Sequence, residues 1–149
     1  RLFKMADFPI VCANYGMEGT VLEGLVKPYV ILERDGLKIG VFGLGAKMEG
    51  LVQADKCEGV VFKDPVPVAN EVAAKLKDVE GCDAVVCLSH LEMLVHQTRN
   101  IDVVLGGHSH TFMQEPVFFQ NLDGESIPVS HTGKNGIFVG KIDLTFERE

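Results

Sequence analysis

Two short apolar segments, each ending in histidine, constrain the fold of this chain more than any other feature. The first is Asp83–His90, Asp-Ala-Val-Val-Cys-Leu-Ser-His, and the second is Asn100–Thr111, Asn-Ile-Asp-Val-Val-Leu-Gly-Gly-His-Ser-His-Thr. A β-branched, apolar run followed at once by polar residues is typical of a buried strand that breaks into a loop. The intervening residues suffice for the crossover of a dozen or so residues that parallel strands need. The pattern therefore predicts two neighbouring parallel strands whose loops lie at one edge of a sheet.

The histidines that follow these strands are candidate metal ligands. Ligands collect at the carboxyl ends of strands in open α/β sheets, so we expect His90, His108 and His110 to converge there. Gly106 and Gly107 permit the sharp turn that this convergence needs. Neutral imidazole is the commonest protein ligand of transition metals. A lone His-x-His is more often a pair of polar loop residues, but the second histidine segment favours a metal site.

These motifs resemble those of a known family. Leu88–Leu91 and Gly106–Thr111 resemble the last two motifs of the calcineurin-like metallophosphoesterases, specifically their 5'-nucleotidase branch. Flanking segments match in the family's order over nearly the whole chain, at 8–14, 27–31, 36–44 and 133–140. The resemblance implies an α/β fold, part of a metallophosphatase-type αββα sandwich, with a mixed sheet in which two adjacent strands carry the metal motifs. It also implies that residues 1–149 are the carboxyl-terminal part of that domain.

The function implied by the resemblance is that of a dinuclear-metal phosphoesterase. We expect 5'-nucleotidase-like hydrolysis of nucleoside monophosphates to nucleoside and phosphate by a metal-bridged hydroxide. Two divalent ions, Zn, Mn or similar, would be bound, one by His90 and His108 and the other by His110. The resemblance also implies a periplasmic or extracellular enzyme.

The rest of the family's site is expected outside this chain. The earlier family motifs Asp-x-His, Gly-Asp and Gly-Asn-His-Asp/Glu supply the acid dyad and the other ligands, and none occurs in residues 1–149. The second nucleotidase domain, which contributes substrate-binding residues in the family, is likewise expected elsewhere. We therefore identify no catalytic or substrate-binding residue here, and expect the chain alone to be inactive and to have the remainder of the same protein as its partner.

Other functions fit the same residues. One is a non-catalytic metal-binding module that keeps the histidines without the acid and the bridging aspartate. Another is a related phosphodiesterase or sugar-nucleotide hydrolase. A third is a protein with three merely structural histidines, which predicts no metal uptake.

Composition narrows the choice of partner. The 149 residues carry a formal net charge of −7, and Lys and Arg are scattered, so no basic face is available for a nucleic acid polymer. A nucleotide or another small phosphate ester remains compatible, because bound metal ions would supply the local positive charge. No apolar run reaches the roughly 20 residues of a membrane span.

The four cysteines show no Cys-x-x-Cys pair. Cys12 and Cys87 lie within apolar strands, which predicts buried thiols. A Cys57–Cys82 bridge stays open at this point.

The remaining pattern predicts scaffold elements. Strands are expected at 8–13, 29–33, 37–42, 116–120, 127–131 and 137–146, with irregular structure over 46–62. Asp35-Gly36 predicts a hairpin turn. Asp64-Pro65 begins a helix that ends at Gly81. Its apolar face is expected to pack on the sheet and consists of Val66, Ala69, Val72, Ala73, Leu76 and Val79.

Three further polar residues are assigned to structure. Asn14 is interpreted as a turn-former, His96 as a solvated side chain and His131 as a structural histidine. The crossover at Leu91–Arg99 departs from the family, since Glu92-Met93-Leu94 replaces a glycine and a longer acidic segment. Either the loop is shortened in this branch of the family or residues are omitted near Leu91–Met93, and we favour the omission.

Overall fold

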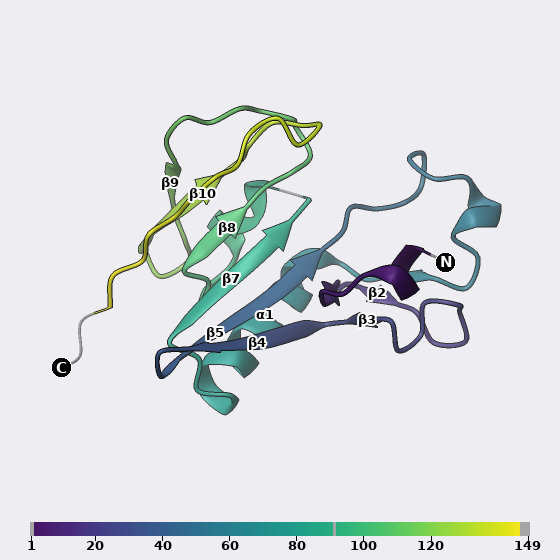
Figure 1. Ribbon diagram of the computed structural model, residues 1–149, viewed down its shortest axis with the longest axis horizontal. Helices are drawn as coiled ribbons and strands as arrows, with labels where there is room; N and C mark the ends of the chain where they lie inside the picture. Colours follow the sequence, from purple (N-terminus) through teal and green to yellow (C-terminus); the bar gives the residue numbers. More distant parts are fainter. Residues whose placement is uncertain (1, 91, 147–149) are drawn as a thin grey trace.

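The computed structural model describes residues 2–90 and 92–146 and has a six-stranded mixed sheet at its centre (Figure 1). Across the sheet, the strands are β4 (Tyr29–Arg34), β5 (Leu37–Leu44), β7 (Ala84–Ser89), β8 (Val103–Leu105), β10 (Ser126–Ser130) and β9 (Val117–Gln120). The four central strands run parallel, and β4 and β9 are antiparallel to their neighbours at the two edges. This confirms the predicted α/β fold and the adjacency of the two histidine-bearing strands.

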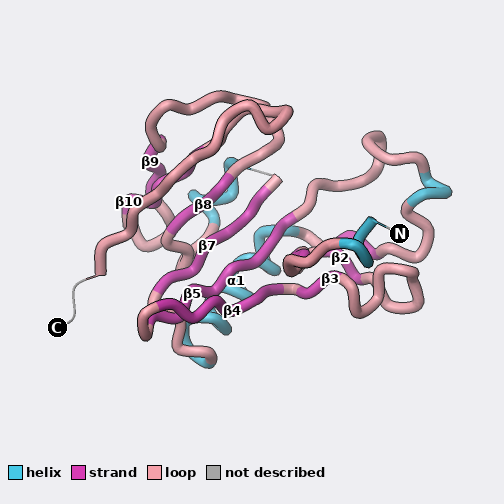
Figure 2. The backbone as a smooth tube through the Cα atoms, viewed as in Figure 1, coloured by secondary structure: helices cyan, strands magenta, loops and turns pink. Residues whose placement is uncertain are grey.

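Small elements surround this sheet. Two-stranded pairs are formed by β1 (Ile10–Val11) with β3 (Val26–Lys27) and by β2 (Tyr15–Gly16) with β6 (Val61–Phe62). Short 3-10 helices are η1 (Leu2–Met5), η2 (Ala54–Lys56) and η4 (Glu92–Gln97). The β1–β3 and β2–β6 pairs lie with long loops beyond the carboxyl end of β5 (Figure 2). The strand predicted over 8–13 is thus much shorter, and the β2–β6 pair was not predicted.

The β4–β5 hairpin turns where the sequence predicts it. Asp35 and Gly36 have φ values of 52° and 80°. Two successive residues with positive φ match the turn that fits the right-handed twist of paired strands, and Asp-Gly tolerates it well. The hairpin therefore follows from local sequence alone.

Helix α1 (Pro65–Ala74) begins as expected. The Asp64 side chain accepts a hydrogen bond from the backbone N–H of Val66 at 3.0 Å, and Pro65 is the first helical residue. This cap satisfies one of the N–H groups that a helix start leaves without a partner.

Near the end of the helix, the buried face differs from the one that the sequence predicts. The chain continues from α1 into a π-helical turn, η3 (Lys75–Val79), and Gly81 ends it with φ 66°. A π turn holds an extra residue, which shifts the helical phase. Leu76 is therefore fully buried while Val79 is 75% exposed, so the assignment of Val79 to the buried face was wrong.

The core lies between the helix and one face of the sheet. Gly40 of β5 allows the close approach, because a Cβ there would lie 2.9 Å from both terminal methyl groups of Leu76. Fully buried residues of this core are Phe42, Ala69, Ala73, Leu76, Val85, Cys87, Val104 and Val129.

The opposite face of the sheet is also apolar. Side chains alternate along a strand, so residues next to Gly40 point away from α1. Val41 pairs with Val86 on this second face. Leu32 and Leu88, on the same face, are 38% and 39% exposed. The sheet therefore presents apolar side chains on both sides.

The predicted last strand, 137–146, is not formed. Within the part that the structure describes, these residues run as a loop with no strand pairing. Val139 is 96% and Ile137 69% exposed, and Phe138 stacks on Phe112 with ring centroids 4.1 Å apart. Apolar alternation is not sufficient for a strand, because the backbone groups need a neighbouring strand to bond.

All four cysteines are free thiols, so no Cys57–Cys82 bridge is present. Cys87 is fully buried, whereas Cys12 and Cys57 are partly exposed. Burial raises the pKa of the Cys87 thiol well above its usual range.

No described helix has the length and apolar character to cross a membrane. Leu91 lies outside the described residues, so the structure does not test whether residues are omitted at that point.

Candidate metal centre

Two of the three predicted metal ligands meet at the carboxyl edge of the sheet. His90 directly follows β7, and His108 follows the Gly106–Gly107 pair after β8. The Nδ1 atom of His108 and the Nε2 atom of His90 are 2.6 Å apart. The ring centroids are 4.5 Å apart and the rings are inclined by 66°. Residues 18 positions apart in sequence thus direct one ring nitrogen each toward a common point.

This pair suits half of a metal site. Bonds of about 2.0–2.1 Å to a tetrahedral Zn²⁺ would hold two imidazole nitrogens about 3.3 Å apart, so the rings need to separate by less than about 1 Å. A neutral imidazole has a lone pair on one nitrogen, which is the donor that Zn²⁺ and similar ions take. The donor type and the facing nitrogens therefore fit a divalent transition ion.

The third predicted ligand, His110, lies two residues further along the same loop. It is exposed and has φ 57°, in the left-handed region that few non-glycine residues adopt. The positive φ that turns this loop is therefore at His110, whereas Gly107 has an ordinary φ and space for a Cβ. Among the described residues, no group of three or more His, Cys, Asp or Glu side chains is arranged to hold an ion. The ligand role of His110 remains a prediction.

Backbone hydrogen bonds tie the two histidine segments to different neighbours, in addition to the pairing of β7 with β8. The N–H of His90 donates to the carbonyl of Leu44 at 2.9 Å, which ties the end of β7 to the end of β5. The N–H of Gly106 donates to the carbonyl of Ser130 at 2.8 Å, which ties the end of β8 to β10. Each imidazole is thus carried by a different neighbouring strand.

Two other histidines serve the scaffold. His96 on η4 bonds the Gln120 carbonyl through Nδ1 at 3.0 Å and lies edge-on to the Phe119 ring, so its side chain is exposed but not merely solvated. His131 is 2% exposed, and its Nδ1 accepts from the backbone N–H of Gly133 at 3.1 Å. His131 matches the structural role expected of it.

Sequence reasoning missed a pair of polar contacts beside His90. Asn14 is fully buried and exchanges two hydrogen bonds with the backbone of Gly45, and the Tyr15 hydroxyl donates to the carbonyl of Ala46. Asn14 is therefore a link between loops and not a local turn-former. These partners are separated by 31 positions, and no sequence pattern joins them.

A cavity of about 220 Å³ adjoins the histidine pair. It is lined by Tyr15, Gly45, Ala46, Met48, Leu51, Val52 and His90. His90 thus faces the same small space as the residues that hold the end of β5.

Comparisons with known proteins agree with the family motifs. No family model matches the chain. It is 25% identical over 169 residues to the trifunctional nucleotide phosphoesterase protein YfkN of Bacillus subtilis (strain 168), covering 99% of this chain and 11% of that protein. It is 27% identical over 167 residues to the snake venom 5'-nucleotidase of Crotalus adamanteus, covering 98% of this chain and 28% of that protein.

The fold comparison leads to the same proteins. The crystal structure of a 5'-nucleotidase precursor from Thermus thermophilus superposes with a TM-score of 0.79 at 26% identity, over 87% of this chain and 29% of that one. The crystal structure of YfkN, a calcineurin-like phosphoesterase, superposes with a TM-score of 0.68 at 28% identity, over 88% of this chain and 48% of that one.

In sequence and in fold, the chain is therefore similar to calcineurin-like phosphoesterases. Within that class, the predicted resemblance to the 5'-nucleotidases is confirmed. The chain spans only 11% and 28% of the length of the two curated relatives.

Proposed function

We propose that this chain is part of a 5'-nucleotidase-like phosphoric ester hydrolase that converts nucleoside monophosphates to nucleoside and phosphate. The observation that carries the proposal is the 2.6 Å approach of His90 Nε2 and His108 Nδ1 at the carboxyl edge of β7 and β8. The similarity to 5'-nucleotidases in both sequence and fold supports it.

We assign His90 and His108 to one divalent ion and His110 to a second. Two such ions, Zn, Mn or similar, would supply an activated water and neutralise the phosphoryl oxygens when bound. His90 and His108 would remain neutral and donate one nitrogen each, so they add no charge to a site that binds an anion. The hydrogen bonds from the His90 and Gly106 main chains would hold the two rings in place while substrate binds.

The remaining ligands and the catalytic acid dyad are proposed to come from the rest of the same protein. The apolar second face of the sheet, with Leu32 and Leu88 more than one-third exposed, supports this division. Packing further protein on it would bury the 38–39% of these side chains that is exposed, a gain of about 0.5–1 kcal/mol each, since complete burial of an exposed leucine is worth about 1.5–3 kcal/mol. Residues 1–149 would then be the carboxyl-terminal part of a metallophosphatase domain, active only within the whole protein.

A periplasmic or extracellular location is part of the proposal. It is supported by the similarity to a snake venom 5'-nucleotidase.

The experiment is metal and activity measurement on three variants of the whole protein. His90→Ala and His108→Ala should each lose most of the bound metal, which inductively coupled plasma mass spectrometry measures. They should also lose most of the activity toward adenosine monophosphate. His96→Ala is the matched control, because His96 is an exposed histidine that bonds Gln120 instead of another histidine. It should keep both properties.

Three results would contradict the proposal. They are equal losses from all three substitutions, full metal content in the His90 and His108 variants, or robust nucleotide hydrolysis by residues 1–149 alone. Metal binding by the whole protein without hydrolysis of any phosphate ester would instead indicate a non-catalytic metal-binding module.

A further inference from the structure

The strongest group of polar contacts outside the histidine pair joins residues 14–15 to residues 44–46. Asn14 is 0% exposed, and its Oδ1 accepts from the N–H of Gly45 at 2.8 Å. Its Nδ2 donates to the carbonyl of Gly45 at 2.8 Å and to that of Lys63 at 3.4 Å. The amide therefore holds both sides of Gly45, which fixes the position and the orientation of this part of the backbone.

Tyr15 holds the next peptide group. Its hydroxyl donates to the carbonyl of Ala46, and its ring lies directly against Gly45. A Cβ at Gly45 would be 2.4 Å from the ring carbon Cζ, so only glycine fits here without displacing the ring. A phenol is protonated at neutral pH and can donate; burial, with a further contribution from the neighbouring Cys12, raises the pKa of Tyr15 above its ordinary value.

The segment held in this way carries the main chain of His90. Leu44 is paired with Ser89 in the sheet, and its carbonyl accepts the His90 N–H at 2.9 Å. His90, Tyr15 and Gly45 also line one cavity. A shift of residues 44–46 would therefore move His90.

His108 has a further anchor that residues 44–46 do not share, although its strand β8 is also paired with β7. Its loop is tied through Gly106 to Ser130 on the far side of β8, and neither residue contacts the 14–15 segment through a described hydrogen bond. The separation of the two imidazole nitrogens therefore depends on how firmly residues 44–46 are held. Metal sites require their ligands to be placed within about 0.5 Å.

From this chain of contacts we propose that Asn14 and Tyr15 are positioning residues for His90, acting through the backbone of Leu44–Ala46. The proposal rests on the proposed function, because it concerns the same metal site. It adds two residues that no ligand motif contains and that reach the site only through main-chain atoms.

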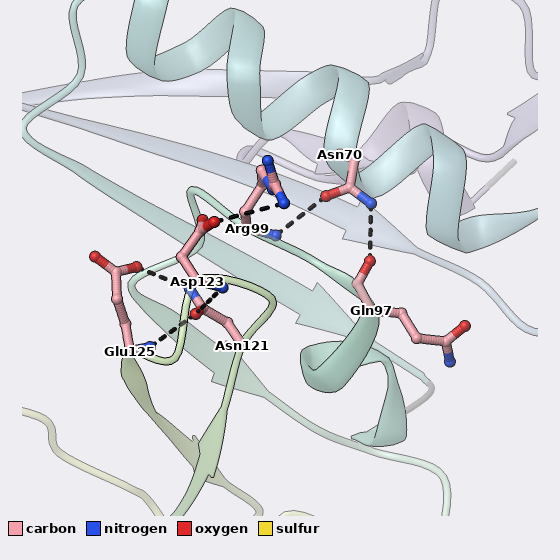
Figure 3. A network of polar contacts seen from close by, with 6 residues as sticks. All are labelled: Asn70, Gln97, Arg99, Asn121, Asp123 and Glu125. Carbon is pink, nitrogen blue, oxygen red and sulfur yellow. Dashed lines mark hydrogen bonds and ion pairs between the residues drawn. The ribbon is translucent and has the colours of Figure 1, made fainter.

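The chain offers matched controls for both residues. Asn70 makes a similar link elsewhere: its Nδ2 donates to the carbonyl of Gln97 and its Oδ1 accepts from the N–H of Arg99 (Figure 3). Its Nδ2 also donates to the carbonyl of Val66 within the helix. Tyr29 donates its hydroxyl to Glu80 Oε1 at 2.8 Å and does not line the cavity beside His90. Substitution of these controls removes the same kinds of bond without releasing residues 44–46.

The experiment is a titration of the whole protein with Co²⁺. Calorimetry measures the affinity, and the visible absorption spectrum of the bound ion reports the geometry of its ligands. We expect Tyr15→Phe and Asn14→Ala to weaken Co²⁺ binding by about 10- to 100-fold, the range typical of residues that orient metal ligands, and to shift the absorption bands. Tyr29→Phe and Asn70→Ala should keep the wild-type affinity and spectrum, even where their melting temperatures fall equally.

The outcomes separate this inference from the proposed function. Loss of Co²⁺ binding in His90→Ala together with wild-type binding and spectrum in Tyr15→Phe would overturn the positioning role alone. Undiminished Co²⁺ binding in His90→Ala would overturn the metal site itself. Tyr15→Phe removes a single oxygen atom, so it decides the matter even if Asn14→Ala does not fold. Equal spectral changes in the control variants would show a general effect of stability and would also refute the inference.

Discussion

Substitution of Gly45 by alanine should destabilise the protein through one identifiable contact. The added Cβ would lie 2.4 Å from both Cζ and the hydroxyl oxygen of Tyr15, so the ring must leave its position and lose its bond to Ala46. Loss of the hydrogen bond costs about 0.5–1.5 kcal/mol, and forced repacking costs about 1–3 kcal/mol. We therefore expect Gly45→Ala to lower the free energy of unfolding by about 2–4 kcal/mol.

A double-mutant cycle tests the cause. In a Tyr15→Ala background the added methyl group meets no ring, and Gly45 does not have a left-handed φ. Gly45→Ala should then be neutral, or stabilising by about 0.4–1 kcal/mol through the smaller conformational entropy of the unfolded chain. The predicted coupling energy between the two positions is thus about 2–5 kcal/mol.

The assay is urea unfolding of the whole protein. The wild type, the two single variants and the double variant are compared, and their free energies of unfolding should depend on urea concentration with the same slope. Gly107→Ala is the matched glycine control, because the nearest atom to its added Cβ is the Ser89 carbonyl oxygen at 4.0 Å. It should change the free energy of unfolding by less than about 0.5 kcal/mol. Additivity of Gly45→Ala and Tyr15→Ala within about 0.5 kcal/mol would refute the reasoning.

Two further predictions concern the core. Maleimide at neutral pH should modify the partly exposed Cys57 long before Cys87, with the labelling followed by mass spectrometry. The reason is that only the thiolate reacts and burial raises the pKa of the Cys87 thiol. Equal rates of labelling would contradict this. Leu76→Ala should cost about 2–5 kcal/mol in urea unfolding, since Leu76 is fully buried. Adding Gly40→Ala to that variant should recover part of the lost stability, because the added Cβ would occupy the space of the missing Leu76 methyl groups. A further loss of stability would show that the cavity left by Leu76→Ala had already collapsed.

Local sequence was sufficient for elements whose interactions are themselves local. The Asp35-Gly36 turn, the Asp64 cap and the end of the helix at Gly81 each depend on residues within a few positions of one another. The order and adjacency of β7 and β8 also followed, because apolar runs with polar ends leave few arrangements in a parallel sheet. The same reasoning predicted that histidines would gather at this edge.

Predictions failed where a partner distant in sequence decides the outcome. Alternation over 137–146 did not form a strand, because these residues form no ladder of backbone hydrogen bonds with any described strand. Val79 points to solvent because a π turn changes the helical phase, which the apolar spacing does not reveal. The roles of Asn14 and Tyr15 depend on backbone groups 31 positions away, so neither residue type nor spacing could assign them.

The sequence alone therefore determined the class of fold, the family resemblance and which residue types are available to bind a metal. Only the tertiary structure decided that a ring nitrogen of His90 lies 2.6 Å from one of His108, and the ligand roles of His90, His108 and His110 all remain predictions. The physical reason is that imidazole chemistry belongs to the residue, whereas the distance between two imidazoles is set by strand pairing and by backbone contacts from distant parts of the chain.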